Sequence, residues 1–306
     1  MSLPRVLRIG FADMWGHGEY QFNPYANYFY KLLSLCYTVE LADDRLDVLF
    51  FSCFGDRHKE ITATTKIYIC GENIASPGSD RKIEPEYVQC DLSLSQFAQS
   101  NTNYYFPLWA LFINWFHEKN PLPLPSNPTY LTNPDDLISN RCVFASDKLH
   151  DCCFMNNNPM EDRVKLYKSL SSRIKVNSYG KLFNNVGYLL RGHEGDKCEI
   201  VKSHRFTISY ENSYRHGYNT EKIIHPYSVG SIGIYSGGLD RTIFNSRALF
   251  FNEDYESEED MIDDLIECSK NPIYFKEKVN EPLFIDDRLP SRLKPVSVLS
   301  WINERI

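Results

Sequence analysis

Apolar runs and helix-spaced apolar positions alternate along the first half of the chain. Short, almost continuously apolar segments predict strands buried on both faces of a parallel sheet, and they are Val6–Phe11, Asp47–Phe54 and Lys66–Cys70. Apolar residues at helical spacing predict helices at Tyr25–Leu35 and Leu108–His117. This alternation is typical of β-α-β units, so the pattern predicts an α/β fold.

The segment Asn120–Asp136 interrupts this alternation with five prolines. Proline lacks a backbone N–H and has a fixed φ, so the segment continues neither a helix nor a central strand. We therefore expect it to cross from one part of the chain to another.

The alternation resumes after the Pro-rich segment. Predicted strands and helices follow one another at Cys152–Met155, Asp162–Leu170, Phe206–Tyr210, Thr220–Val229, Ile232–Tyr235 and Glu258–Lys270. Two β-α-β series separated by a Pro-rich crossing predict two Rossmann-like lobes that face a cleft. We place residues 1–149 in the first domain and residues 150–306 in the second.

Composition and charge restrict the function. The chain has 306 residues, of which 42% are hydrophobic and 24% charged, which suits two folded domains. Its net charge is −7 and its basic residues form no block, whereas a nucleic-acid surface needs concentrated positive charge. We therefore expect no nucleic-acid partner.

The cysteines and the apolar segments indicate a compartment. Nine cysteines, an odd number without a C-x-x-C pair, are typical of reduced thiols in a cytosolic chain. No apolar run reaches membrane-spanning length, and the opening MSLPRVLRIGF does not resemble a signal peptide. We expect a cytoplasmic or soluble protein without a membrane span. That a natural N-terminal anchor was trimmed away stays an open alternative.

The densest group of reactive side chains lies in FTISYENSYRHGYNTEK, residues 206–222. Tyr210 ends a predicted strand and Thr220 is a candidate N-cap, so this stretch joins a strand to a helix N-terminus. Helix N-termini bind phosphate through free amides and a partial positive charge, and Lys222 adds a full charge. Asn212 and Tyr218 are neutral donors.

Glu221 does not suit a bare anion site, because its carboxylate accepts hydrogen bonds from hydroxyls such as those of a sugar. Phosphate and hydroxyls together indicate a sugar nucleotide. The alternative is that Thr220 only caps a helix and that Glu221 and Lys222 are surface charges. The tripeptide Thr-Glu-Lys alone favours that alternative, while the longer stretch is far more specific.

This stretch resembles the signature of glycosyltransferase family 10, the α-1,3/4-fucosyltransferases. That signature runs F-x-x-x-F-E-N-S, a short spacer and Y-x-T-E-K, and the chain matches it with Phe206, Tyr210–Ser213 and Tyr218–Lys222. Four further segments are similar to family motifs, namely Asp47–Gly55, Gly71–Asn73, Tyr179–Lys181 and Ala248–Tyr255. The resemblance covers most of the chain.

The resemblance implies a GT-B fold and the inverting transfer of L-fucose from GDP-fucose to a glycan hydroxyl, in α-1,3 or α-1,4 linkage to GlcNAc or glucose. It implies that the first domain binds the acceptor and the second binds GDP-fucose. Carried over by position, it makes Glu72 the general base and places Lys181 and Lys222 on the diphosphate. Asn212 and Tyr218 would lie beside them, and Glu221 would bind ribose or fucose hydroxyls.

No protein-bound metal or cofactor is expected beyond the co-substrate. The chain has no Asp-x-Asp, the pair of carboxylates by which many transferases hold Mg²⁺ or Mn²⁺ against a diphosphate. Lys181 and Lys222 would offset the diphosphate charge instead. Some bacterial members carry an arginine where this chain has Phe183, so either Lys181 or Arg191 would supply that anion contact.

Trp15, His17 and Tyr20 follow the first predicted strand and are weaker candidates for stacking on the acceptor sugar. A plain aromatic loop is an equal alternative for them. Two other functions stay open for the whole chain. One is a related glycosyltransferase with a different nucleotide sugar or acceptor, and the other is a non-catalytic protein that binds sugar nucleotides.

Overall fold

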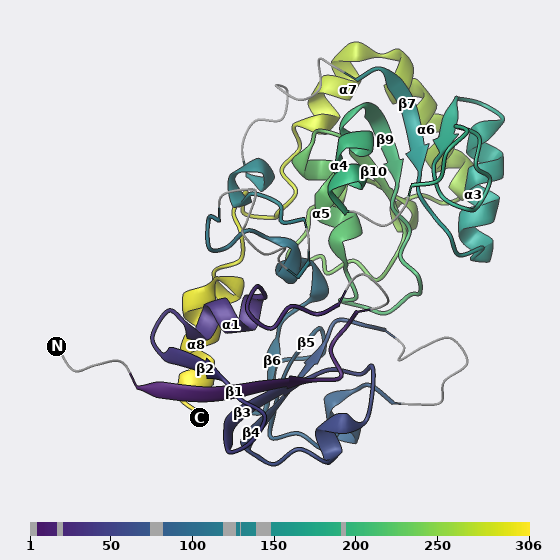
Figure 1. Cartoon of the computed structure of the whole chain (residues 1–306). Helices are drawn as coiled ribbons and strands as arrows, with labels where there is room; N and C mark the ends of the chain where they lie inside the picture. The colour runs from purple at the N-terminus through teal and green to yellow at the C-terminus, as the bar shows by residue number, and fades with distance from the viewer. Residues whose placement is uncertain are drawn as a thin grey trace. The chain divides into compact units, whose positions relative to one another are not determined.

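The computed structural model describes residues 5–16, 21–73, 82–118, 127–128, 130–138, 148–190 and 194–306. They form two compact units (Figure 1). The first unit comprises Met1–Pro128 together with Pro290–Ile306, and the second comprises Thr129–Leu289. His17, Tyr20 and Arg191 lie outside the described residues.

The first unit is built on a six-stranded sheet in which all neighbouring strands are parallel. In spatial order the strands are β2 (Thr38–Leu41), β1 (Val6–Ala12), β3 (Leu46–Phe51), β4 (Ala63–Cys70), β5 (Leu92–Ser95) and β6 (Asn103–Tyr105). The three strands predicted in this half are confirmed as β1, β3 and β4. Their apolar runs are largely buried, as a sheet covered on both faces requires.

Helices of the first unit are few and short. The α-helices are α1 (Tyr28–Leu33) and α8 (Pro295–Asn303), and the 3₁₀ helices are η1 (Arg57–Lys59), η2 (Pro85–Tyr87), η3 (Leu108–Phe112) and η7 (Ser291–Leu293). Asn27 caps α1, because its Oδ1 accepts from the next helical amides, Phe29 N and Tyr30 N, both at 3.0 Å.

The helix predicted at residues 108–117 is wrong beyond its first turn, since only η3 forms there. The carbonyl oxygen of Ala110 accepts from the indole Nε1 of Trp115 at 2.7 Å. A continuing α-helix would pair that carbonyl with a backbone N–H one turn later. The buried indole thus takes the acceptor that helix propagation needs.

The C-terminal segment belongs to the first unit, where α8 contacts α1 (Figure 1). The hydroxyl of Tyr37 donates to Asn303 Oδ1 at 3.0 Å, and the hydroxyl of Tyr104 donates to the carbonyl of Arg292. The predicted second domain, residues 150–306, therefore included residues 290–306 wrongly. Their apolar periodicity predicts a buried helix face but not which core buries it.

The second unit holds a five-stranded parallel sheet. In spatial order its strands are β11 (Phe250–Phe251), β10 (Ile232–Tyr235), β9 (His204–Ile208), β7 (His150–Phe154) and β8 (Val176–Ser178). Among its described residues, the helices are α3 (Glu161–Ser171), α4 (Glu194–Lys202), α5 (Glu221–Ser228), α6 (Glu258–Lys270), α7 (Pro272–Val279) and the 3₁₀ turns η4 (Pro134–Leu137), η5 (Ser246–Ala248) and η6 (Asn252–Asp254). The three strands and three helices predicted here are confirmed within a few residues.

The helices of the second unit cover both faces of its sheet. Helices α3 and α6 lie on one face and α4 and α5 on the other (Figure 1). Phe154 and Phe206 pack with Met261 of α6 in the main core, whereas the neighbouring Cys153 faces Val201 of α4. Alternate side chains of one strand thus serve two cores, which explains why its sequence is apolar without interruption.

Both sheets follow one strand order, in which the second strand of the unit lies outside the first and the third lies on its other side. The order reverses direction between β1 and β3 in the first unit and between β7 and β9 in the second. In open α/β sheets, ligands bind beyond the carboxyl ends of the strands at such a switch point. Each unit therefore has one edge where a ligand site is expected.

Candidate functional site

The segment after β9 extends the carboxyl edge of the second sheet. The backbone N–H of Glu211 donates to the carbonyl of Ser236 at 2.9 Å, so the chain stays aligned with the end of β10. This alignment turns the Glu211 side chain inward, where it is only 1% exposed. A carboxylate at such a position must find donors within the protein, because burial without them is costly.

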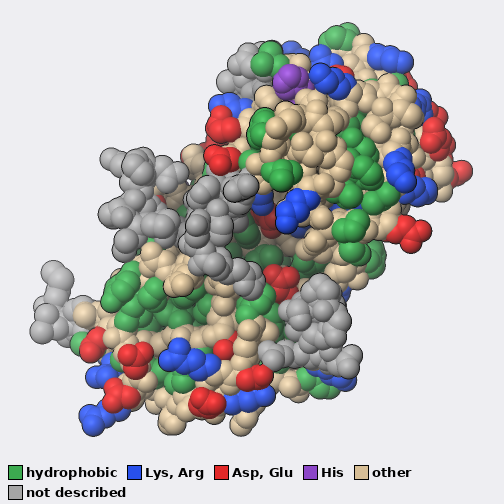
Figure 2. Space-filling model, turned by 45° about the vertical axis from the view of Figure 1, so that its right-hand side comes forward, with side chains coloured by type: hydrophobic (Ala, Val, Ile, Leu, Met, Phe, Trp, Pro, Cys, Tyr) green, Lys and Arg blue, Asp and Glu red, His purple; other side chains and the backbone are tan. Residues whose placement is uncertain are grey.

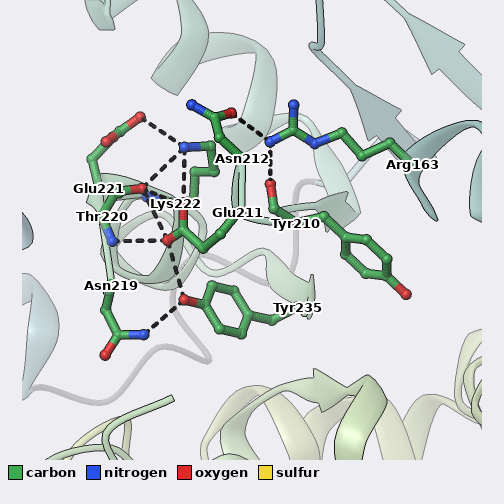
Figure 3. A network of polar contacts seen from close by, with 9 residues as sticks. All are labelled: Arg163, Tyr210, Glu211, Asn212, Asn219, Thr220, Glu221, Lys222 and Tyr235. Atoms are coloured by element: carbon green, nitrogen blue, oxygen red, sulfur yellow. Dashed lines mark hydrogen bonds and ion pairs between the residues drawn. The ribbon is translucent and has the colours of Figure 1, made fainter. Parts of the chain in front are cut away.

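Glu211 is the centre of a hydrogen-bond network (Figure 3). Its Oε1 accepts from the backbone N–H of Thr220 at 2.8 Å and from the hydroxyl of Tyr235 at 3.1 Å. Its Oε2 accepts from Lys222 Nζ at 3.1 Å, and the Thr220 hydroxyl lies within 3.0 Å of both oxygens. Four groups from two elements therefore meet on one carboxylate.

Lys222 is held at the N-terminus of α5. Thr220 is the N-cap of this helix, as predicted, and its Oγ1 accepts from the backbone N–H of Lys222 at 3.4 Å and from Nζ at 3.1 Å. Burial alone would lower the pKa of Lys222, but the charges of Glu211 and Glu221 raise it. The ammonium is therefore charged and fixed, and its side chain is still 22% exposed.

Glu221 opens the first turn of α5 beside this lysine. Its Oε1 lies 3.8 Å from Lys222 Nζ, and its side chain is 23% exposed. Burial would raise the pKa of Glu221, but the charges of Lys222, His225 and Lys197 outweigh it and lower the pKa to about 2. At neutral pH this carboxylate is an acceptor only, as recognition of a sugar hydroxyl requires.

Asn212 and Tyr218 belong to the same loop, between β9 and α5. The amide of Asn212 is exposed, and its Oδ1 accepts from the guanidinium NH2 of Arg163 at 2.7 Å. Tyr218 is 2% exposed and lies near Arg163, whose pKa it helps to raise against the effect of burial. Four predicted residues, Asn212, Tyr218, Glu221 and Lys222, are therefore gathered around one loop.

Lys181 follows β8 at the same edge of the sheet but is not part of the network in Figure 3. Its backbone N–H donates to Asn157 Oδ1 at 2.9 Å, and its side chain is exposed. A Cβ on Gly180 would lie 2.2 Å from the carbonyl oxygen of Asn156, so only glycine lets this turn pack on the turn after β7. The exposed ammonium leaves Lys181 able to reach an anion.

Phe183 occupies the position where some family members carry an arginine. Its ring stacks on Tyr167 of α3, with centroids 4.5 Å apart and planes 7° apart. The side chain therefore extends the apolar core of the second unit. It cannot contribute to anion binding.

Sequence reasoning missed two residues of this site, Glu211 and Arg163. Glu211 was part of the matched motif, but no role was assigned to it, and Arg163 lay unnoticed in an amphipathic helix. The available signal for Glu211 was its place directly after a strand, in a stretch that ends with Lys222. An ionisable residue at the carboxyl end of a strand in a parallel sheet is a candidate for a binding or catalytic role.

In the first unit, Glu72 follows β4 at the carboxyl edge of the sheet and is half-buried. Its backbone carbonyl accepts from Gln96 Nε2 at 2.6 Å, which fixes the turn. A Cβ on Gly71 would lie 2.5 Å from Leu108 Cδ1, so the turn also packs tightly against the Leu108 side chain. The backbone that carries the predicted base is well held.

Trp15 lines a cavity of about 360 Å³ at the carboxyl end of β1, the switch point of the first sheet. Phe22, Gln21, Asp13 and Arg57 also line it. The rings of Trp15 and Phe22 meet edge to face at 5.4 Å. The cavity thus combines two aromatic rings with a mostly polar exposed lining, which suits a sugar that stacks by one face and hydrogen-bonds through its hydroxyls.

The described residues contain neither a candidate metal cluster nor a helix that could cross a membrane. Among them, no three His, Cys, Asp or Glu side chains gather as a metal site would require. None of the described helices has both the length and the apolar character to span a bilayer. On the face drawn in Figure 2, lysine and arginine side chains are interspersed with acidic ones and form no continuous stripe.

Two parallel sheets of one strand order, with a fixed lysine at a helix N-terminus beyond one of them, define an α/β protein of the GT-B glycosyltransferase class. Residues 145–278 match the family model described as glycosyltransferase family 10 (fucosyltransferase), C-terminal part. Residues 9–112 match the N-terminal domain of the alpha-(1,3)-fucosyltransferase FucT. The chain belongs to glycosyltransferase family 10.

Curated relatives agree with this assignment. The chain is 26% identical to the alpha-(1,3)-fucosyltransferase FucT of Helicobacter pylori over 286 residues, 85% of this chain and 56% of that protein. It is 30% identical to 4-galactosyl-N-acetylglucosaminide 3-alpha-L-fucosyltransferase 9 of Homo sapiens over 134 residues, 42% of this chain and 35% of that protein. The chain spans only 26% to 56% of the length of the first relatives it matches.

Solved structures share the fold. A crystal structure of an alpha1,3-fucosyltransferase with GDP-fucose aligns with a TM-score of 0.72 at 21% identity, covering 99% of this chain and 91% of that one. An alpha-glucosyltransferase in complex with UDP aligns with a TM-score of 0.55 at 10% identity, covering 98% of this chain and all of that one. The predicted GT-B fold is confirmed.

Proposed function

We propose that this protein transfers L-fucose from GDP-fucose to a glycan hydroxyl with inversion at the anomeric carbon. The second unit binds the donor and the first unit binds the acceptor. Membership of family 10 supports the reaction, and the name of the solved relative with GDP-fucose supports the donor. The observation that carries the proposal is the charged, immobilised Lys222 at the helix N-terminus beyond the second switch point.

The donor site follows from the charges at that edge. The diphosphate lies against the ammonium of Lys222 and the first amides of α5, where a full charge and a helix dipole act together. Lys181 adds a second ammonium from the turn after β8. Glu221 accepts from ribose or fucose hydroxyls, and Asn212 and Tyr218 line the loop beside them.

The chemical step is a single displacement. The acceptor oxygen attacks the anomeric carbon as its proton passes to the carboxylate of Glu72, and the bond from that carbon to the diphosphate breaks. GDP leaves with the bonding electron pair, and its added charge is stabilised by Lys222 and Lys181. The sugar is inverted because attack and departure take place on opposite faces.

The test begins with binding. Thermal unfolding and calorimetry with GDP, UDP and guanosine should show stronger stabilisation by GDP than by guanosine, because Lys222 and Lys181 act on phosphates. A GDP-fucose donor also predicts stronger stabilisation by GDP than by UDP, which carries the same diphosphate on another base. Stronger stabilisation by UDP would favour a related transferase with another nucleotide sugar. Incubation with GDP-fucose and a glycan array, read by mass spectrometry, then tests transfer. GDP binding without transfer to any acceptor would indicate a non-catalytic binding protein and contradict the proposal.

A further inference from the structure

Arg163 is an unusual residue of α3. The buried positions of this helix are Arg163, Leu166 and Leu170, which share one face at helical spacing. An arginine therefore stands where the periodicity calls for an apolar residue, and it is only 2% exposed. A guanidinium remains charged in proteins, so its burial needs compensation from partners.

The compensation within the chain is incomplete. The NH2 group donates to the carbonyl of Tyr210 and to Asn212 Oδ1, both at 2.7 Å. The Nε atom is buried and has no hydrogen-bond partner among the described residues. Burial lowers the pKa of Arg163, and the charges of Glu211 and Glu221 oppose this from a distance. Such a cation favours an anion at the adjoining surface.

Arg163 also determines which end of Asn212 faces the site. A guanidinium only donates hydrogen bonds, so the amide must turn its oxygen toward Arg163. The Nδ2 of Asn212 then points away from Arg163, as Figure 3 shows, and this residue is exposed. Asn212 therefore offers a ligand two N–H donors and no acceptor.

We propose that Arg163 is a positioning residue of the donor site, which holds Asn212 so that its amide donates to an acceptor-only group, the diphosphate. The incompletely paired guanidinium adds its charge beneath that group. This inference rests on the proposed function. The resemblance led us to expect an arginine at the position of Phe183, with an anion contact that Lys181 or Arg191 would have to supply instead. We assign that contact to Asn212, held in place by Arg163. Tyr167, on which Phe183 stacks, lies one turn along α3 from Arg163.

Two variants test the inference, with GDP, guanosine and inorganic pyrophosphate as probes in calorimetry. Asn212→Asp keeps an oxygen for Arg163 but replaces the outward donor with a carboxylate oxygen. Arg163→Met removes the guanidinium and keeps the length of the side chain. Both should weaken GDP and pyrophosphate binding about tenfold or more, as expected for loss of a hydrogen bond to a charged group, and leave guanosine binding unchanged. Arg163→Lys should recover part of the loss.

Arg173→Met is the matched control, because Arg173 follows the same helix and pairs at the surface with Glu259 and Asp263. It should bind all three probes as the wild type does. Thermal unfolding of Asn212→Asp should stay close to wild type, which keeps the test valid if Arg163→Met folds poorly.

The outcomes separate the two proposals. Equal losses for guanosine and GDP would make Arg163 merely structural and overturn the inference. Unchanged pyrophosphate and GDP affinity in Asn212→Asp would overturn it as well, while the donor assignment stands. A wild-type protein that binds pyrophosphate but not GDP would overturn the proposed donor alone, and one that binds neither would overturn both.

Discussion

The two sheets have the same strand order but very different carboxyl edges. At the second switch point, Glu211, Lys222 and Arg163 bring full charges together in a largely buried network. At the first, the rings of Trp15 and Phe22 line an open cavity together with the polar side chains of Asp13 and Arg57. Topology therefore determines where each unit can bind a ligand, and the side chains determine which chemistry it accepts.

The contact between Asp13 and His58 at the first edge shows how differently the two edges use their polar side chains. The carboxylate of Asp13 accepts from His58 Nδ1 at 2.7 Å and from the backbone N–H groups of Arg57 and His58 at 3.1 and 2.9 Å. A Cβ on Gly55 would lie 2.2 Å from Asp13 Oδ1, so the carboxylate is packed as well as bonded. These bonds hold the turn together, whereas at the second edge the ammonium-bearing side chain of Lys222 stays partly exposed.

Glu72→Gln in the first unit is the sharpest test of whether one unit supplies the base and the other binds the donor. It should lower turnover about 100- to 10,000-fold, the range for loss of a general base, because the amide cannot take the acceptor proton. GDP affinity should not change if the second unit alone binds the donor. The measurement is single-turnover transfer together with calorimetry. Glu86→Gln, an exposed site in the same unit, is the control, and near-normal turnover in Glu72→Gln would rule out this base.

Lys222→Met tests the opposite edge. Loss of hydrogen bonds from an ammonium to phosphate should weaken GDP binding about 10- to 100-fold. Guanosine binding should change little, because it lacks the diphosphate. Lys168→Met, at an exposed position of α3, is the matched control and should bind GDP normally. A GDP complex that is indifferent to Lys222 would place the diphosphate elsewhere.

Much of the fold was predictable because continuous apolar runs mark strands that are buried on both faces. β10 and α6 were predicted to the residue, and β3 and β4 within three residues. The edge strand β2 was missed, since its side chains alternate between exposed and half-buried and carry little apolar signal. Placement of α8 depends on residues far earlier in the chain, such as Tyr104, whose ring centroid lies 5.3 Å from that of Trp301 in α8.

Site residues were predictable where their position in a sequence motif alone fixes their place in the fold. Lys222 and Glu221 follow an N-cap, and the cap places them at the helix N-terminus without further information. Glu211 accepts a hydrogen bond from Tyr235 on the neighbouring strand β10, and Arg163 donates to the Tyr210 carbonyl in a loop 47 residues away. Such partnerships arise from strand pairing and helix packing, which one sequence does not reveal.

Glu211→Gln measures how much the contacts of Glu211 with Lys222, Thr220 and Tyr235 contribute to the stability of the second unit. A glutamine retains the shape but removes the charge next to Lys222 and replaces one oxygen with an NH2 group, so donors face donors whichever way the amide is turned. We expect the free energy of unfolding to fall by about 3 kcal/mol, the lower range for breaking a buried ion pair. GDP affinity should fall as well, because Lys222 is no longer fixed.

The matched control is Glu259→Gln, which breaks an exposed ion pair with Arg173 in the same unit. Surface pairs contribute about 0–1 kcal/mol, so urea denaturation should place this variant near the wild type. Equal stability of the two variants would mean that the Glu211 network is not what holds the edge together.

The smallest expected effect is a pH dependence of the second unit. Burial lowers the pKa of His204 to about 4, although its bond to the Ile200 carbonyl opposes this. The neutral ring fits its surroundings, since Nδ1–H donates to that carbonyl at 2.7 Å and Nε2 accepts from Asn177 Nδ2 at 3.0 Å. Protonation of Nε2 would set two donors against each other.

The sign follows from linkage. The unfolded histidine has a pKa near 6.5, above the folded value, so the unfolded chain takes up the proton first as the pH falls. The free energy of unfolding should therefore decrease between about pH 6.5 and 4, by up to about 1.4 kcal/mol per pH unit. His204→Gln should weaken this dependence in urea denaturation followed by circular dichroism but leave the share of His225, whose pKa burial also lowers to about 4. The exposed control His216→Gln should keep the full dependence. Tryptophan emission should respond less, because Trp15, Trp109, Trp115 and Trp301 all lie in the first unit. If His204→Gln and the wild type lost stability in parallel, the acid sensitivity would have to be sought in other groups.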